Sequence, residues 1–180
     1  EFISNEYCPS GIVSPELIAK YSNISYNYGE YGNCFDGVLE HDAGRFHIYL
    51  NKQVILYPDN TGLRFSFAHE LGHYFIDEHR NALKKGKSLH KSYHRLLPKN
   101  IIEYEADCFA SNLLMPPCRF TQFIQRRKFD FSVIESLSKE FATSLSATLF
   151  KFVDIGNYPI MVIYSQSNKI KYHWCSDDFP

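Results

Sequence analysis

The segment FAHELGHYF, residues 67–75, constrains the fold more than any other part of this 180-residue chain. Its two histidines, His69 and His73, are four positions apart, so on an α-helix they share one face, with Cβ atoms about 5–6 Å apart. Two imidazoles placed in this way can bind one Zn²⁺ ion, each at about 2.0–2.1 Å. Glu70 lies about 100° around the helix from His69. It therefore flanks the metal position, where it is able to accept a proton from water that the metal activates.

The residues around this motif help to distinguish a metal site from a chance pair of histidines. The apolar residues of the segment are Phe67, Ala68, Leu71, Tyr74 and Phe75. On a helical wheel with His69 at 0°, they lie at about 140–260°. A salt-bridged helix on the surface does not need so much apolar backing. We therefore predict that this helix packs on a core with its apolar face and directs its histidines to a metal.

The composition is typical of one globular domain. The chain is 44% hydrophobic and 22% charged, with a net charge of −1. This charge argues against a broad attraction to nucleic acid or to an anionic membrane, and no apolar run reaches the roughly 20 residues that span a bilayer. The five cysteines form no CxxC pair, which argues against a cysteine-based zinc site and is typical of reduced thiols. We expect a cytoplasmic protein that binds neither nucleic acid nor membrane directly.

The sequence before the motif predicts several short elements. They are a helix from Pro15 capped by Ser14, a β-hairpin within residues 35–51 that turns at Gly44, a strand at residues 54–57, and a cap for the motif helix at Asn60 or Thr61. After the motif, residues 79–97 are rich in histidine, lysine and arginine and predict a solvated loop. The alternative is a mobile flap over an active site, which would supply Tyr93 or His94 to the substrate.

A second helix, predicted at residues 101–115 and ended by Pro116, is expected to supply the missing metal ligand. Two histidines leave a zinc site one protein ligand short, because a catalytic site keeps its fourth position for water. Glu103 and Glu105 compete for this role. They are about 200° apart around the helix, so only one of them can face the metal. We favour Glu103 and expect Glu105 to be a solvated acid.

The face that carries Glu103 also carries Ala106, Asp107 and Ala110. The two alanines would let another helix approach closely. Asp107 lies one turn from Glu103 and would hold a ligand histidine through its other ring nitrogen. No cation of this helix lies on the same face, which argues against a simple ion pair for Glu103.

The two motifs are HELGH at residues 69–73 and ExEADxFAxxLLMP at residues 103–116. Together they resemble the ImmA/IrrE family of zinc metallopeptidases, and the resemblance covers roughly residues 35–165. It implies an α/β (α+β) fold with a small, partly antiparallel sheet beside the motif helix. It also implies regulated cleavage of a DNA-binding repressor or antitoxin. The ligand set of two histidines and a downstream glutamate also resembles that of thermolysin-type zinc peptidases.

Beyond the second motif the sequence predicts helices at residues 117–127, 133–141 and 145–155 and a C-terminal β-hairpin at residues 160–174. Ser132 and Glu135 are expected to form the capping box of the middle helix. The last two helices have helix-turn-helix spacing, but Lys151 is the only cation of the second one, too few for a recognition helix. We predict a metallopeptidase core in residues 1–116 and a C-terminal part in residues 117–180, packed as one domain.

These features favour a zinc-dependent endopeptidase with Glu70 as general base, Zn²⁺ as cofactor and a protein or peptide as substrate. The alternatives are a metal-binding sensor or regulatory module without proteolysis, and a structural zinc protein. The developing oxyanion requires a further hydrogen-bond donor. The candidates for this donor are Tyr93, His94, Tyr104 and His90.

Overall fold

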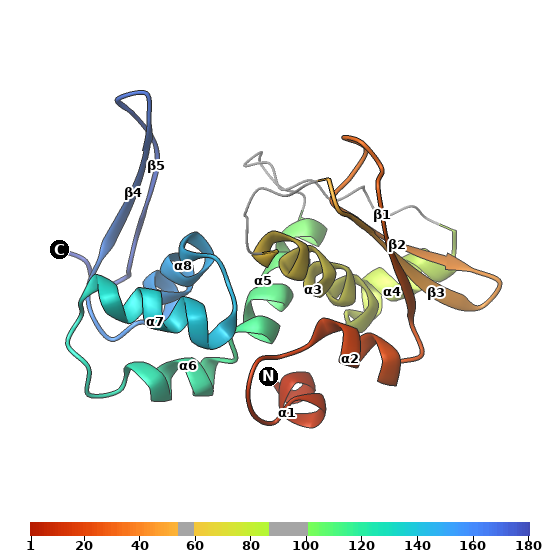
Figure 1. The fold of residues 1–180 in the computed structure, drawn as a ribbon, viewed down its shortest axis with the longest axis horizontal. Helices are drawn as coiled ribbons and strands as arrows, with labels where there is room; N and C mark the ends of the chain where they lie inside the picture. Colours follow the sequence, from red (N-terminus) through yellow and green to blue (C-terminus); the bar gives the residue numbers. More distant parts are fainter. Residues whose placement is uncertain (54–59, 87–100) are drawn as a thin grey trace. The chain divides into compact units, whose positions relative to one another are not determined.

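The computed structural model describes residues 1–53, 60–86 and 101–180, which form two compact units, Glu1–Leu114 and Met115–Pro180 (Figure 1). Each unit combines helices with a small sheet, so the α+β class predicted from the sequence is confirmed. The strand predicted at residues 54–57 lies outside the described residues. The packing of residues 1–116 and 117–180 as one domain stays a prediction.

The first unit carries the HELGH motif and residues 103–114 of the second motif. Its elements are α1 (Phe2–Tyr7), α2 (Pro15–Tyr21), β1 (Ser25–Gly29), β2 (Gly37–Asp42), β3 (Arg45–Asn51), α3 (Thr61–Phe75), α4 (Asp77–Lys84) and α5 (Ile101–Leu114). The predicted start of α2 is confirmed, because the Ser14 hydroxyl accepts a hydrogen bond from the Leu17 backbone N–H at 3.2 Å.

The three strands of this unit form one sheet in the order β1-β3-β2. β2 is antiparallel to β3, as the predicted hairpin requires, whereas β1 is parallel to β3. The hairpin turns through Ala43 and Gly44, whose φ angles of 46° and 78° are both left-handed. Such a two-residue turn matches the right-handed twist of the strands that it joins.

Strand β1 was not predicted, because residues 21–32 are polar, rich in tyrosine and interrupted by asparagine and glycine, and the alternation of Ile24, Tyr26 and Tyr28 is short. Its connection to β2 is held by Asn51, a fully buried residue at the end of β3. The Asn51 side-chain amide donates to the backbone carbonyls of Gly32 and Phe35, both at 2.7 Å. The strand thus depends on partners distant in the sequence, which a local pattern does not reveal.

Helix α3, which carries the HELGH motif, contacts β2, β3 and α5 (Figure 1). Every residue from Ser66 to His73 is buried. The apolar side of the helix joins a core cluster that includes Ile48 and Leu50 of β3, and burial of each such side chain stabilises the fold by about 1.5–3 kcal/mol. The histidine side is also closed off from solvent, so the polar groups there require partners.

Two predictions about this region need correction. Asn60 occupies the N-cap position of α3, as one of the two predicted alternatives, but its φ of 60° is left-handed and its side chain forms no capping hydrogen bond. Residues 79–84, which fall in the predicted solvated loop, belong to α4 (Asp77–Lys84), in which His79 and Leu83 are buried. Only one of these two residues is apolar, so the sequence shows little of the buried face. The acids in the first turn and Lys84 in the last favour the helix through its dipole.

The second unit contains α6 (Pro117–Ile124), α7 (Phe131–Phe141), α8 (Leu145–Ile155), β4 (Met161–Gln166) and β5 (Lys169–Cys175). Its own core contains Phe120, Phe141 and Phe152, each no more than 2% exposed. The predicted helices are present, and β4 and β5 form the predicted antiparallel hairpin. These elements give the unit a core of its own.

Two details of the second unit differ from what the sequence suggests. The Asp130 carboxylate accepts a hydrogen bond from the Ser132 backbone N–H at 2.8 Å, so Asp130 caps α7 and the predicted capping box at Ser132 is wrong. Lys151, the only cation of α8, is 4% exposed. α8 therefore presents no lysine or arginine to a phosphate group.

Candidate metal centre

Helix α3 places the two motif histidines together in the interior of the first unit. His69 is 4% exposed and His73 is 1% exposed. Their Nε2 atoms face each other at 3.1 Å. The helical spacing thus brings one nitrogen of each ring to a common point, as the HExxH pattern predicts.

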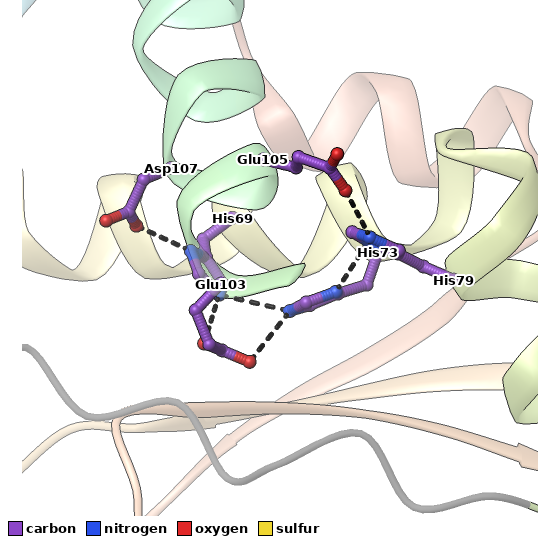
Figure 2. Close-up of polar contacts among 6 residues, drawn as sticks. All are labelled: His69, His73, His79, Glu103, Glu105 and Asp107. Carbon is purple, nitrogen blue, oxygen red and sulfur yellow. Dashed lines mark hydrogen bonds and ion pairs between the residues drawn. The ribbon is translucent and has the colours of Figure 1, made fainter. Parts of the chain in front are cut away.

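Glu103 of α5 directs its carboxylate to the same point (Figure 2). Its Oε2 atom lies 3.2 Å from His69 Nε2, and its Oε1 atom lies 3.7 Å from His73 Nε2. Three ligands bound at about 2.0–2.1 Å in tetrahedral geometry are about 3.3–3.4 Å apart. The observed separations bracket this value. Within the described residues, these three side chains are the one group placed to hold a metal ion together.

Close contact between α3 and α5 makes this convergence possible. A Cβ atom added to Gly72 would lie 3.2 Å from the Ala106 Cα atom and 3.2 Å from the Ala106 carbonyl oxygen. Gly72 directly precedes His73, and Ala106 lies one turn beyond Glu103. Small residues on both helices therefore bring the backbones near enough for a glutamate side chain to reach two imidazoles, the close approach that the alanines of α5 predict.

Asp107 contacts the first histidine at Nδ1, the ring nitrogen that does not face His73 and Glu103. Its Oδ1 atom lies 2.8 Å from His69 Nδ1. If Nε2 of His69 presents its lone pair to a metal, Nδ1 carries the ring proton and donates it to Asp107. Such a contact fixes the tautomer and the orientation of a ligand histidine.

His73 has a different partner, which the sequence does not suggest. Its Nδ1 atom lies 3.1 Å from Nδ1 of His79 in α4, and Nε2 of His79 lies 3.0 Å from Glu105 Oε2 (Figure 2). The expectation that Glu105 is merely a solvated acid is therefore wrong: its side chain is 49% exposed but pairs with a buried histidine. A helical wheel shows that Glu105 points away from Glu103, but it does not show that α4 lies on that side.

The environment of His73 keeps its ring neutral. Burial lowers the pKa of His73 to about 3, the nearby rings of His69 and His79 act in the same direction, and Glu103 opposes them. A neutral imidazole keeps the lone pair that a metal ligand must offer. The donor set therefore fits a zinc ion, which favours nitrogen and carboxylate oxygen ligands.

Glu70 is 2% exposed and lies against the first residue of β2. A Cβ atom added to Gly37 would meet the Glu70 carboxylate, 2.9 Å from Oε1 and 3.3 Å from Cδ. The absence of a side chain at residue 37 therefore leaves the space that the carboxylate occupies. The sheet and α3 together fix the position of this acid.

The candidate oxyanion donors divide into two groups. Tyr93 and His94, like His90, lie outside the described residues. Tyr104 follows Glu103 in α5 and is 58% exposed.

Two residues of the site were not predicted from the sequence. They are His79, which contacts His73, and Gly37, which lies beside Glu70. The signal for His79 was present only as one histidine six positions after His73.

Comparison with known proteins identifies a related fold. A solved structure described as a Mycobacterium tuberculosis transcriptional regulator has the same fold, with a TM-score of 0.61 and 15% sequence identity over 92% of this chain. This chain covers 48% of that one, about half its length. Among curated proteins no match was found. None of the helices in residues 1–53, 60–86 and 101–180 has the length and hydropathy that crossing a bilayer requires.

The sequence also matches a family model over residues 38–152, a range that includes both motifs. The model describes the IrrE N-terminal-like domain, a peptidase family. The matched range is more than half of the chain, and it contains the histidine pair of α3 and all three acids of α5. The chain therefore belongs to the family of IrrE N-terminal-like peptidase domains, as the resemblance of its two motifs implies.

Proposed function

We propose that this protein is a zinc-dependent endopeptidase whose metal is held by His69, His73 and Glu103. The observation that carries the proposal is the convergence of two imidazole nitrogens and one carboxylate at mutual distances of 3.1, 3.2 and 3.7 Å. Membership in a peptidase family supports it. Three protein ligands leave the fourth position of a tetrahedral ion open for a reactant, which is typical of catalytic sites and not of structural ones.

In this proposal Glu70 and Asp107 have different roles beside the metal ion. A bound zinc ion supplies Lewis acidity and makes water acidic near neutral pH. Glu70, which lies next to His69 in the sequence and is fixed against Gly37, accepts the proton of the attacking water and then passes it to the leaving amine. Asp107 holds His69 in the tautomer that directs Nε2 to the metal. Burial of the site strengthens each of these electrostatic interactions.

We propose a protein or peptide substrate, specifically a DNA-binding repressor or antitoxin, because the ImmA/IrrE resemblance implies one. The fold shared with a transcriptional regulator is compatible with a role in gene regulation. Direct binding of nucleic acid by this chain is not part of the proposal, since its net charge is −1 and α8 buries its only lysine. The five free cysteines are compatible with a cytoplasmic location.

The decisive experiment compares the native protein with Glu70→Gln. Both are loaded with zinc and incubated with a proteome-derived peptide library, and new N-termini are identified by mass spectrometry. We expect Glu70→Gln to bind one zinc ion per chain and to produce no cleavage, because the carboxylate acts on water and not on the metal. Glu140→Gln, which changes an exposed acid of α7, is the control and should cleave like the native protein.

The same experiment separates the peptidase from the metal-binding sensor. Cleavage by Glu70→Gln at the native rate would remove Glu70 from the mechanism. If the zinc-loaded native protein produces no new N-termini, and Glu70→Gln regulates its partner normally, the sensor is the correct function. His73→Ala completes the set, because it should lose zinc binding as well as cleavage.

A further inference from the structure

The contact between His73 and α4 extends the candidate metal centre beyond the two motif helices. His79 is 3% exposed and lies between His73 and Glu105, at 3.1 Å from the first and 3.0 Å from the second. Each contact is within hydrogen-bond distance. The three side chains come from three different helices, α3, α4 and α5, and form one chain of contacts that ends at the partly exposed Glu105 carboxylate.

Only one arrangement of protons satisfies this chain when His73 binds a metal. Nε2 of His73 faces His69 and Glu103 and must present a lone pair, so Nδ1 of His73 carries the proton. That proton can be donated only if Nδ1 of His79 is an acceptor. A neutral His79 then carries its proton on Nε2, which donates to the Glu105 carboxylate.

The carboxylate selects this arrangement. A neutral histidine without a partner at Nε2 is free to carry its proton on Nδ1, which would place two N–H groups against each other at 3.1 Å between His79 and His73. Glu105 accepts hydrogen bonds and donates none when ionised, so it favours the tautomer with the proton on Nε2 of His79. The effect of Glu105 on His73 is transmitted entirely through His79.

We propose that Glu105 and His79 are positioning residues for the metal centre, and that Glu105 orients His73 through His79 as Asp107 orients His69 by direct contact. The inference rests on the proposed function, since it takes His73 to be a zinc ligand. It assigns a role to α4 and gives both ligand histidines a carboxylate from the same helix, α5. Partners of ligand histidines typically contribute 10–100-fold to metal affinity.

The test measures zinc affinity, by competition with a chromogenic chelator, for Glu105→Ala, His79→Phe and the double variant. We expect Glu105→Ala to weaken zinc binding by about 10–100-fold. Glu105→Gln keeps an acceptor oxygen and should restore most of the affinity. The double variant should bind no more weakly than His79→Phe alone, because Glu105 has no effect without His79. Glu78→Ala, which removes an exposed acid of the same helix α4, is the control and should bind like the native protein.

Cobalt-substituted protein provides a second readout. The visible absorption of bound Co²⁺ should change in Glu105→Ala and in His79→Phe, because His73 reorients, whereas a merely structural role would lower the stability of the metal-free protein and leave the spectrum unchanged. Native zinc affinity in Glu105→Ala, or additive losses in the double variant, would overturn the inference while leaving the proposed peptidase intact. A native protein that binds no zinc would instead overturn both.

Discussion

Gly72→Ala tests whether close contact between α3 and α5 forms the metal centre. The new methyl group would lie 3.2 Å from two backbone atoms of Ala106 and 3.2 Å from Cβ of Phe109. Carbon atoms in favourable contact are about 3.5–4.0 Å apart. Since the backbone of a helix cannot rotate away as a side chain does, the two helices must separate by about 0.3–0.8 Å.

The two consequences of this separation differ in size. Overpacking costs about 1–3 kcal/mol, and the higher helix propensity of alanine offsets up to about 1 kcal/mol of that. We therefore expect the free energy of unfolding to fall by about 1 kcal/mol. Metal binding should suffer more, because ligand distances must hold to within about 0.2 Å and Glu103 moves with Ala106. A loss of at least tenfold in zinc affinity is expected, equivalent to about 1.4 kcal/mol.

The assay combines urea unfolding of the metal-free protein with a chelator competition for zinc. Ile48→Val is the matched control, since it removes one methyl group from the core of β3, where Ile48 is fully buried, and costs about 0.5–1.5 kcal/mol. It should leave zinc affinity unchanged. Native zinc affinity in Gly72→Ala would refute the reasoning, and so would an equal loss of affinity in Ile48→Val.

Two further predictions concern metal removal and pH. Chelation of zinc from the native protein should lower Tm without unfolding it, because the first unit has its own hydrophobic core. Zinc at 1,000 times its Kd adds about 4.1 kcal/mol to the free energy of unfolding. Loss of the far-UV circular dichroism signal on chelation would contradict the expectation that the metal-free protein stays folded. Stability should fall as pH rises above about 10, because burial and the hydrogen bond to Glu16 raise the pKa of Tyr28 above its usual value, so the unfolded state loses the proton first. Tyr28→Phe should make this decline less steep in urea titrations between pH 9 and pH 11, and an unchanged slope would exclude Tyr28 as its source.

The elements that the sequence predicted well are those whose evidence is local. The spacing of His69 and His73 depends only on the pitch of one helix. The helix start at Ser14 and the hairpin turn at Gly44 depend on residues that are neighbours in the chain. In each case the physical cause acts over a few neighbouring residues, so the local sequence is sufficient to predict the element.

The elements that the sequence did not predict depend on partners far along the chain. β1 is a strand because β3 pairs with it in parallel and because Asn51 secures the loop that follows. The contact of Glu105 depends on where α4 places His79, 26 residues earlier in the chain. A helical wheel gives the direction of a side chain about its own helix axis and contains no information about what lies there. The helical periodicity therefore correctly placed Glu103 and Glu105 on different faces of α5. It also led to the wrong expectation that Glu105 contacts only solvent.

The HExxH pattern is therefore necessary for this site but does not create it. α3 alone offers two imidazole nitrogens and a flanking carboxylate, which any amphipathic helix with the same five residues would offer. Glu103, the proposed third ligand, reaches the histidines because Gly72 and Ala106 lack the side-chain bulk that would otherwise hold α5 away. Packed helices have axes about 8–10 Å apart, and the side chains at the contact set the distance. A glutamate side chain has a fixed length, so larger residues at this contact would move its carboxylate away from the histidines. If the proposed metal centre is correct, a small residue directly before the second histidine and a small residue three positions after the glutamate are as much part of the metal-binding sequence as the ligands are.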